Sequence, residues 1–131
     1  MKTSELIGPA LDWAVAKCEG YTEYCGETEK MLPPRKEYGW VSLFDYNYST
    51  DWNLAGPIIE RECIATYASG ACSVSPKNPD YWVAEILATD EMVTGYGPTP
   101  LIAAMRCYCC AKLGDEIEIP EELQPCHQPN L

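Results

Sequence analysis

Hydrophobic residues near the start of the chain repeat with the period of an α-helix. Four of them stand at positions i, i+3, i+4 and i+7: Leu11, Ala14, Val15 and Cys18. This spacing places them on one helical face. Pro9 suits the first turn, where no N–H is needed, and Gly20 suits the position just beyond the last turn. The pattern predicts a helix over 9–19, preceded by a short turn over Ser4–Ile7.

Helical spacing returns towards the end of the chain. The apolar residues that carry it are Leu101, Ile102, Met105, Cys109 and Leu113. Thr99 has a side chain suited to capping a helix, Pro100 follows at the first helical position, and Gly114 suits the end. These signals predict a helix over 100–113, the clearest element in the sequence.

A punctuated stretch and a shorter helical segment lie between these two helices. Residues 21–39 are polar and interrupted by Pro and Gly, so they predict a loop or lid. A middle helix is expected over Pro57–Glu62, and Asp51 can cap an earlier, irregular first turn. The acidic stretch after the last helix ends at a proline, and residues 120–131 are expected to form a tail.

Several short segments favour β-structure because they are rich in aromatic and branched residues. They are Trp40–Tyr46, Cys63–Tyr67, Ala71–Val74, Tyr81–Leu87 and Met92–Thr94. Tyr81–Leu87 is the best strand among them. Met92–Thr94 is expected to pair with it across a turn at Thr89–Glu91.

The order helix, helix, strands, helix predicts an α+β fold. We expect two or three helices packed on a small antiparallel sheet of three to four strands. A length of 131 residues is common for one hydrophobic core, and no second composition regime appears. The chain is therefore expected to form a single domain over 1–131, with an irregular aromatic-rich loop at about 21–39.

The net charge of the chain limits the classes of partner that it can bind. Nine basic and 20 acidic residues give a net charge of −11, which disfavours nucleic-acid binding, because that binding neutralises phosphates with Lys and Arg. No apolar run is long enough to span a bilayer and no secretory signal precedes the first helix, so no membrane partner is expected. Two interpretations of the acidity remain open: solubility, or imitation of DNA to occupy a host protein.

Eight cysteines require an explanation in a chain with no secretory signal. A reducing cytoplasm favours free thiols that serve as small buried hydrophobes. Cys107 and Cys110 match a C-x-x-C motif, but they fall well inside the last helix, where the helix dipole does not activate a thiol. A zinc site would need two further ligands, and no second pair has suitable spacing, so no metal is expected. The residues that could supply those two further zinc ligands are Cys18, Cys25, Cys63, Cys72, Cys126 and His127.

Two segments share a sequence pattern that indicates a binding site. Tyr48–Glu62 and Gly95–Arg106 each run from a polar turn, through a proline, into an apolar helix. Helix starts carry free N–H groups and are natural sites for anions. If the two starts meet in space, they frame a pocket. The candidate ligand-binding residues are Tyr48, Ser49, Thr50, Asp51, Trp52, Arg61, Tyr96, Gly97 and Thr99.

The same segments carry a resemblance to a known family. Five stretches of the chain are similar to the NinX family of small lambdoid-phage proteins: 10–17, 48–52, 56–62, 97–107 and 112–116. The chain also resembles a broader set of phage "ABA sandwich" domains, which share a Tyr-Ser-Thr-Asp turn and a Thr-Pro helix start. The resemblance implies a phage accessory protein that acts in the cytoplasm of an infected bacterium. It implies no catalytic residues and no cofactor.

Catalytic motifs have little support in the sequence. The single histidine, His127, lies in the Pro-rich tail, so neither a Ser/His nor a Cys/His nucleophile is expected. Gly95-Tyr-Gly97 lacks the lysine and the spacing of a phosphate-binding loop. Carboxylate pairs such as Asp51 with Glu60 arise easily by chance among so many acids. We therefore expect a protein that is not an enzyme.

Aromatic residues favour binding instead. Of 14 aromatic residues, eight lie between positions 21 and 52: Tyr21, Tyr24, Tyr38, Trp40, Phe44, Tyr46, Tyr48 and Trp52. Such rings can stack on nucleobases, or they can seal a core or a subunit interface. Both uses remain open at this point.

Three hypotheses follow. The chain binds and sequesters a nucleotide-like immune signal of the host as a small homo-oligomer, or it is an acidic inhibitor of a DNA-transaction enzyme, or it hydrolyses such a signal. We favour the first. In that hypothesis Tyr48 and Trp52 wall the base, while Ser49, Thr50 and Asp51 bind the ribose. Thr99 and nearby N–H groups then hold phosphate, and Arg61 supplies charge, with Arg106 as the other basic candidate.

Overall fold

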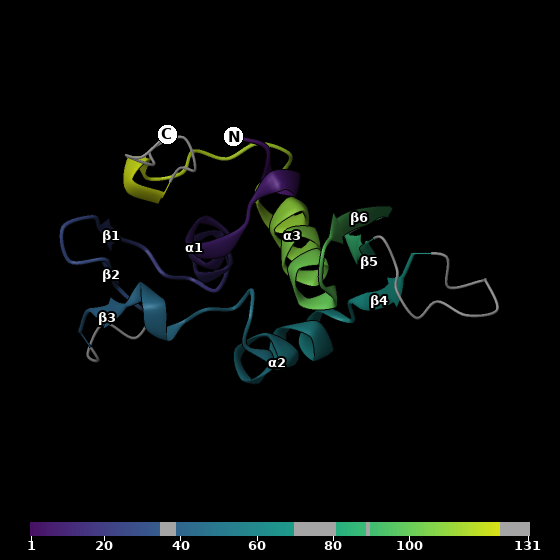
Figure 1. The fold of residues 1–131 in the computed structure, drawn as a ribbon, viewed down its shortest axis with the longest axis horizontal. Helices are drawn as coiled ribbons and strands as arrows, with labels where there is room; N and C mark the ends of the chain where they lie inside the picture. Colours follow the sequence, from purple (N-terminus) through teal and green to yellow (C-terminus); the bar gives the residue numbers. More distant parts are fainter. Residues whose placement is uncertain (35–38, 70–80, 89, 124–131) are drawn as a thin grey trace.

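Helices and short strands alternate along the chain (Figure 1). The computed structural model describes residues 1–34, 39–69, 81–88 and 90–123. Its helices are α1 (Gly8–Cys18), α2 (Trp52–Glu62) and α3 (Pro100–Leu113). Its strands are β1 (Tyr24–Cys25), β2 (Lys30–Met31), β3 (Val41–Ser42), β4 (Ala65–Ala68), β5 (Trp82–Ala88) and β6 (Glu91–Gly97). Short 3-10 turns add η1 (Thr3–Glu5), η3 (Leu43–Asp45) and η4 (Glu121–Leu123).

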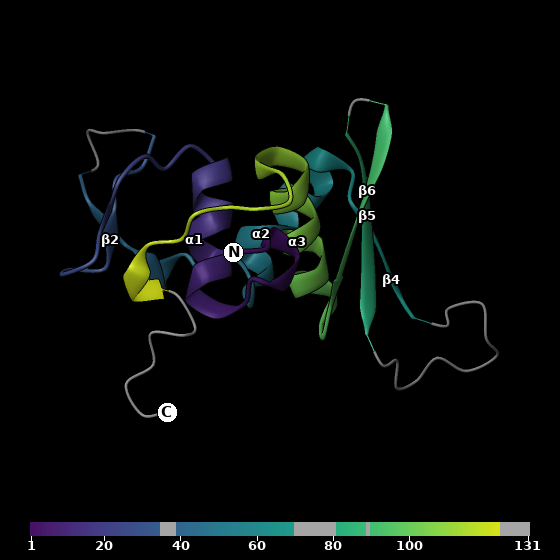
Figure 2. The ribbon, with the colours of Figure 1, turned by 90° about the horizontal axis from the view of Figure 1, so that it is seen from above.

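The elements are arranged in layers, which Figure 2 shows with the larger sheet on edge. That sheet is antiparallel with the order β4-β5-β6, and α3 packs on one of its faces. Helix α1 lies on the far side of α3, and the small antiparallel sheet β1-β2-β3 lies beyond α1. The α+β prediction is confirmed, although the strands form two sheets where one was expected.

Helix α3 is the centre of the hydrophobic core. Its buried residues are Leu101, Ile102, Ala103, Ala104, Met105, Cys107, Tyr108 and Cys109, which point to nearly all sides of the helix. A helix that is apolar all round is buried on all sides. From α1, Leu11, Ala14 and Val15 complete this core on the side away from the sheet, as their spacing predicted.

Two glycines allow α3 to approach the sheet closely. Gly95 and Gly97 both lie in β6 and face the helix. A Cβ atom on Gly95 would lie 2.7 Å from the backbone nitrogen of Cys107, and one on Gly97 would lie 2.8 Å from that of Ala103. The expectation that the strand ends at Thr94 is therefore wrong. These glycines continue the strand, because close packing of backbone on backbone requires them.

The middle helix begins earlier than predicted. Helix α2 starts at Trp52, and Pro57 lies inside it. The Asp51 carboxylate caps the helix by accepting the N–H of Asn53 at 2.9 Å. Gly56 precedes the proline and has no Cβ to clash with its ring, which reduces the cost of a proline in a helix. The cap was foreseen, but the helical first turn was not.

The predicted strand over Trp40–Tyr46 is also wrong in extent. Only β3 is extended, and η3 follows because the Ser42 hydroxyl accepts the N–H of Phe44 at 3.3 Å. The predicted loop over 21–39 contains β1 and β2, which pair through Tyr24 with Met31. Met31 is buried and its strand partner Tyr24 packs against the core, and these apolar contacts explain why a polar stretch pairs at all.

Two further strand predictions have different outcomes. The segment Cys63–Tyr67 becomes β4 only from Ala65, because Cys63 adopts a left-handed conformation (φ 53°) that ends α2. The predicted strand at Ala71–Val74 lies outside the described residues. The turn at Thr89–Glu91 is described only in part, and β5 and β6 pair on either side of it, from Ala88 with Glu91 onwards.

Substituting Gly95 by Ala tests the close packing of α3 on β6. We expect Gly95→Ala to lower the free energy of unfolding by about 1–3 kcal/mol, because the added methyl must displace helix backbone. Urea denaturation followed by circular dichroism measures the change. Glu91→Gln, at an exposed position of the same strand, is the control and should stay within about 0.5 kcal/mol of the wild type. Equal stability of Gly95→Ala and Glu91→Gln would contradict this packing.

Candidate functional site

The two segments singled out in the sequence meet in the structure. They border an open hollow of about 210 Å³, and the lining residues are Ser49, Thr50, Trp52, Thr99, Pro100, Leu101 and Ile102. Helices α2 and α3 run in the same direction, since their other ends also meet, through an ion pair of 3.6 Å between Lys112 Nζ and Glu62 Oε1. The hollow therefore lies where both helices begin.

Each helix start is held by its own cap. Thr99 Oγ1 accepts the N–H of Ile102 at 3.1 Å, and Pro100 occupies the first turn of α3. The Asp51 carboxylate performs the same task for α2. A helix N-terminus carries a partial positive charge of about half an elementary charge. The Asp51 carboxylate offsets this charge at α2, so the start of α3, capped by the neutral Thr99, brings positive charge to the hollow. The arrangement favours a ligand with a negative or electron-rich end.

A buried aspartate positions the first wall of the hollow. Asp12 of α1 is only 7% exposed, and its Oδ1 accepts the N–H of Ser49 at 2.8 Å. Burial raises the pKa of Asp12, while the bonds from Ser49 lower it. The adjacent turn is closed by the N–H groups of Thr50 and Asp51, which donate to the carbonyl of Asn47 at 3.1 and 3.0 Å. The backbone at Ser49 is thus fixed from α1.

Sequence reasoning missed Asp12 as a site-organising residue. The available signal was a carboxylate within an otherwise apolar helix, between Leu11 and Trp13. An acid in such a place needs a hydrogen-bond partner, because an unpaired buried carboxylate is costly. The pattern showed the need for a partner but not that the partner was the turn at Ser49.

The chemistry of the hollow is uncharged. Three hydroxyl side chains, an exposed indole and a proline-leucine-isoleucine wall make up its lining, and none of these side chains titrates. Trp52 is 54% exposed, so its ring can accept a planar group. The arrangement can bind by stacking and by hydrogen bonding, and the lining side chains include hydroxyls but no titratable acid or base.

Four predicted site residues lie elsewhere. Tyr48 is buried at 6% exposure, and burial raises the pKa of its hydroxyl to about 12. Asp51 is used by the cap of α2. Tyr96 projects from the opposite face of β6, where its ring lies 5.7 Å from that of Tyr81. Gly97 packs against α3. None of these four lines the hollow.

Arg61 lies far from the hollow, at the other end of α2. Nine residues of helix separate it from Trp52, a rise of about 14 Å. Its guanidinium donates to Glu19 at 2.6 and 3.2 Å and to Glu62 at 2.9 Å. These bonds to Glu19 and Glu62 raise the pKa of Arg61. The structure therefore does not bring Arg61 to the hollow, and two carboxylates already bind its guanidinium.

Arg106 is also engaged in structure. Its Nε donates to the carbonyl of Leu6 at 2.7 Å, and its Nη1 donates to the carbonyl of Tyr96 at 2.9 Å. Burial lowers the pKa of this guanidinium. Arg106 ties the N-terminal segment to β6 and does not border the hollow.

The aromatic-rich stretch divides into two groups. Tyr21, Tyr24 and Tyr46 are partly buried and pack against the core, with the rings of Tyr21 and Tyr46 5.5 Å apart in an edge-on contact. Trp40, Phe44 and Trp52 are exposed. The predicted aromatic Tyr38 lies outside the described residues. Most of these rings seal the core, and Trp52 is the one that borders the hollow.

The thiols of α3 are not activated. Burial raises the pKa of Cys107 to about 12, and contact with the Cys18 thiol together with burial raises that of Cys109. Raised pKa values keep both as unreactive thiols. In the part of the chain that the structure describes, no three His, Cys, Asp or Glu side chains gather as a metal site would require. The candidates Cys72, Cys126 and His127 lie outside that part.

The Asp12 contact predicts a specific pH dependence of stability. Because burial raises the pKa of Asp12 above 3.8, the folded protein binds this proton more tightly than the unfolded chain does. The resulting stability is fully present below about pH 4 and is lost as pH rises through the raised pKa. Asp12→Asn does not titrate, so the stability of the wild type relative to this variant should fall from about pH 3.5 to 7.

Urea denaturation in matched buffers measures this difference. Glu5→Gln, which removes one exposed negative charge, controls for the general effect of charge. Wild-type and Asp12→Asn stabilities that run parallel across the whole range would show that Asp12 does not have a raised pKa.

The segments that form this hollow lie within a region that matches a known protein family. The family model described as Bacteriophage P22, NinX matches residues 2–112, which include Asp12, both walls of the hollow and nearly all of α3. No curated protein matches the chain. Among the described residues, no helix is long and apolar enough to cross a membrane. The match spans most of the sequence and confirms the resemblance seen in its motifs, so the chain belongs to the NinX family of bacteriophage P22.

Proposed function

We propose that this phage accessory protein binds a small nucleotide-derived signal of the infected host in the hollow between α2 and α3, and withholds it without converting it. One observation carries the proposal. Two segments almost 50 positions apart bring an exposed indole, three hydroxyls and two helix N-termini around the same hollow. Those are the groups that bind a base, a ribose and a phosphate.

The ligand is oriented by the two walls. Its base stacks on Trp52, an interaction worth about 1–3 kcal/mol for a base on an aromatic ring. The Thr50 hydroxyl faces the ribose, whereas Ser49 is only 2% exposed and is hydrogen-bonded to Asp12. Phosphate lies at the start of α3, where Thr99 forms the cap and the N–H of Leu101, in the first turn, lacks a partner within the helix.

Size and charge limit what can bind. A hollow of about 210 Å³ is smaller than the roughly 300–1,000 Å³ of sites that enclose a whole drug-sized molecule. The proposal therefore places one base and its ribose inside and leaves the rest of the ligand at the rim. A net charge of −11 repels anions at long range, so attraction must come at close range from the start of α3, since the Asp51 carboxylate offsets that of α2.

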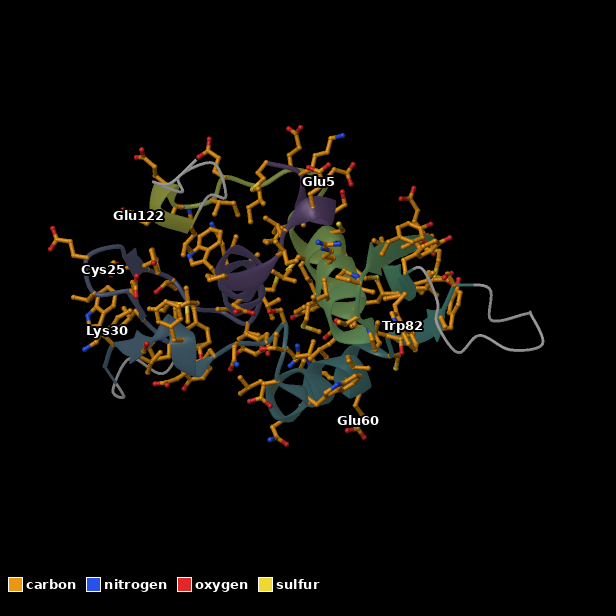
Figure 3. The ribbon with its side chains drawn as sticks, in the orientation of Figure 1. Glu5, Cys25, Lys30, Glu60, Trp82 and Glu122 are labelled. Carbon is orange, nitrogen blue, oxygen red and sulfur yellow. The ribbon has the colours of Figure 1, made fainter. Side chains whose placement is uncertain are left out.

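The geometry favours binding over the two alternatives. A hydrolase needs a base or a metal to activate its nucleophile, and the lining side chains of the hollow include hydroxyls but no titratable group beside them. A mimic of DNA needs its carboxylates in rows on one surface. The labelled glutamates Glu5, Glu60 and Glu122 project from three different parts of the periphery (Figure 3), so the acidic charge is not confined to one surface.

Thermal shift with a panel of ligands tests the proposal. The probes are ADP-ribose, cyclic AMP and cyclic dinucleotides, and we expect at least one of them to raise the melting temperature. Heating the complex and assaying the released material separates the mechanisms. Intact ligand supports sequestration, altered ligand shows an enzyme, and no shift with any probe would leave a protein partner as the function.

Matched tryptophan variants locate the site. Trp52→Ala should weaken ligand binding about tenfold or more, because the stacking surface is lost. Trp40→Ala, at a similarly exposed tryptophan (45%) that does not line the hollow, should bind like the wild type. Isothermal titration measures both. Equal loss in the two variants, or no loss in either, would place the ligand elsewhere.

A further inference from the structure

The larger sheet has an outer face that the described part of the chain leaves uncovered. Helix α3 packs on one side of β4-β5-β6, and no described helix or loop lies on the other (Figure 2). Strand pairing assigns the outward residues, because directly paired residues point to the same side. The outer face comprises Ala65, Tyr67, Val83, Glu85, Leu87, Met92, Thr94 and Tyr96, with Tyr81 just before β5.

Large apolar side chains gather on this face. Ten are exposed among the described residues, and half of them lie here: Tyr67, Tyr81, Leu87, Met92 and Tyr96, at 41–66% exposure. Leu87 and Met92 are directly paired across β5 and β6. Single exposed apolar residues are ordinary, but a contiguous group on one face of a sheet marks an interaction surface.

The sequence of β5 agrees with a sheet covered on both faces. Trp82, Ala84 and Ile86 point to α3, while Val83 and Leu87 point outwards, so the strand is apolar on both sides. A near-continuous apolar run is typical of strands that are buried on both faces. Val83 is already 6% exposed without belonging to the core cluster, because the tyrosines on each side shield it.

Charge excludes nucleic acid as the occupant. Strands that stack bases on outward aromatic rings also need basic residues for the phosphates. On the described outer face the one charged side chain is Glu85, which accepts the hydroxyl of Tyr67 at 2.6 Å. An acidic, tyrosine-rich face repels a polyanion. Because its carboxylate is hydrogen-bonded within the face, Glu85 can be covered by an apolar surface at reduced cost.

We infer that this outer face is the dimer interface of the protein, and that its occupant is the same face of a second copy. Two flat antiparallel sheets can stack about 10 Å apart with their strands within about 30° of each other. A two-fold pair meets the same surface on both sides, so this largely apolar face, with Glu85 hydrogen-bonded to Tyr67, covers itself. The interface shares no residue with the hollow, so this inference and the proposed function are tested independently.

The available area sets the strength of the dimer. A large aromatic side chain offers about 150–250 Å², so three half-exposed tyrosines with Leu87 and Met92 offer roughly 500 Å² per copy. A pair would bury about 1,000 Å², just below the roughly 1,200 Å² of the smallest stable interfaces. The expected dimer is therefore weak, with a dissociation constant in or above the micromolar range.

The dependence of dimerisation on salt distinguishes this dimer from other complexes. Each copy carries a net charge of −11, so the two repel each other, and added salt screens this repulsion over a shorter distance. The apolar contact itself is not weakened by salt. Association of two copies should therefore tighten as NaCl rises, whereas a basic partner or a nucleic acid would bind less tightly.

Sedimentation of the full chain at increasing concentration and in low and high NaCl tests the inference. We expect Leu87→Glu and Met92→Glu each to raise the dissociation constant about tenfold or more, because a carboxylate would be buried beside Glu85. Phe44→Glu is the matched control: it changes the charge equally at a residue of similar exposure (57%) away from the face, and should dimerise normally. Circular dichroism confirms that each variant is folded.

Three results would overturn the inference. The first is a monomer at every concentration up to about 1 mM. The second is a dimer that Leu87→Glu and Met92→Glu leave unchanged, which would place the contact on another surface or at a strand edge. The third is a monomer that binds a single-stranded oligonucleotide and loses this binding in Leu87→Glu, which would assign the face to nucleic acid.

Discussion

The approach of α3 to β6 through Gly95 and Gly97 is the constraint on which the other features depend. Because these two glycines have no Cβ atoms, the backbone of the helix can contact the backbone of the strand. The helix can then be buried between the sheet and α1, which requires it to be apolar on nearly every side. Because Thr99 follows Gly97 by only two residues, the same contact fixes where α3 begins and so where the hollow lies.

Polar contacts complete what apolar packing begins. Asp12 reaches from α1 to the backbone of Ser49 and sets the turn that leads into α2. At the opposite end of α2, Arg61 joins Glu19 from the end of α1 and the buried Tyr108 from α3. The first contact joins α1 to the turn before α2, and the second joins all three helices. The hollow is lined by neutral side chains, and Arg61 and Arg106 both lie elsewhere.

The molecule presents two separate surfaces of different chemistry. The hollow offers hydroxyls, one indole and helix ends, which suit a small polar ligand with a planar part. The outer face of β4-β5-β6 offers tyrosines and aliphatic side chains with little charge, which suit an apolar surface. A face whose one charged side chain, among the described residues, is Glu85 carries little charge for a protein with a net charge of −11. Membership of the NinX family identifies a phage accessory protein and leaves both surfaces to be assigned by experiment.

The sequence by itself determined the elements whose signals are local. Periodicity and caps located α1 and α3 almost to the residue, and the strand-forming run located β5, because these depend on neighbours within a few positions. It also determined the family and the two segments that border the hollow. The glycines of β6 were taken for a turn, since a glycine required by a distant helix looks the same in sequence as one required by local backbone.

Only the tertiary structure decided which side chains reach the hollow. Three predicted residues belong in sequence to the two segments that border the hollow but do not reach it. Tyr48 is buried in the core, Arg61 binds two carboxylates, and Tyr96 lies on the outer face of the sheet. Asp12, distant in sequence, became the residue that positions Ser49. The physical reason is that burial and pairing are shared between elements, so the role of a side chain depends on what packs against it. A residue's type states what it can bind, and the fold decides what it meets.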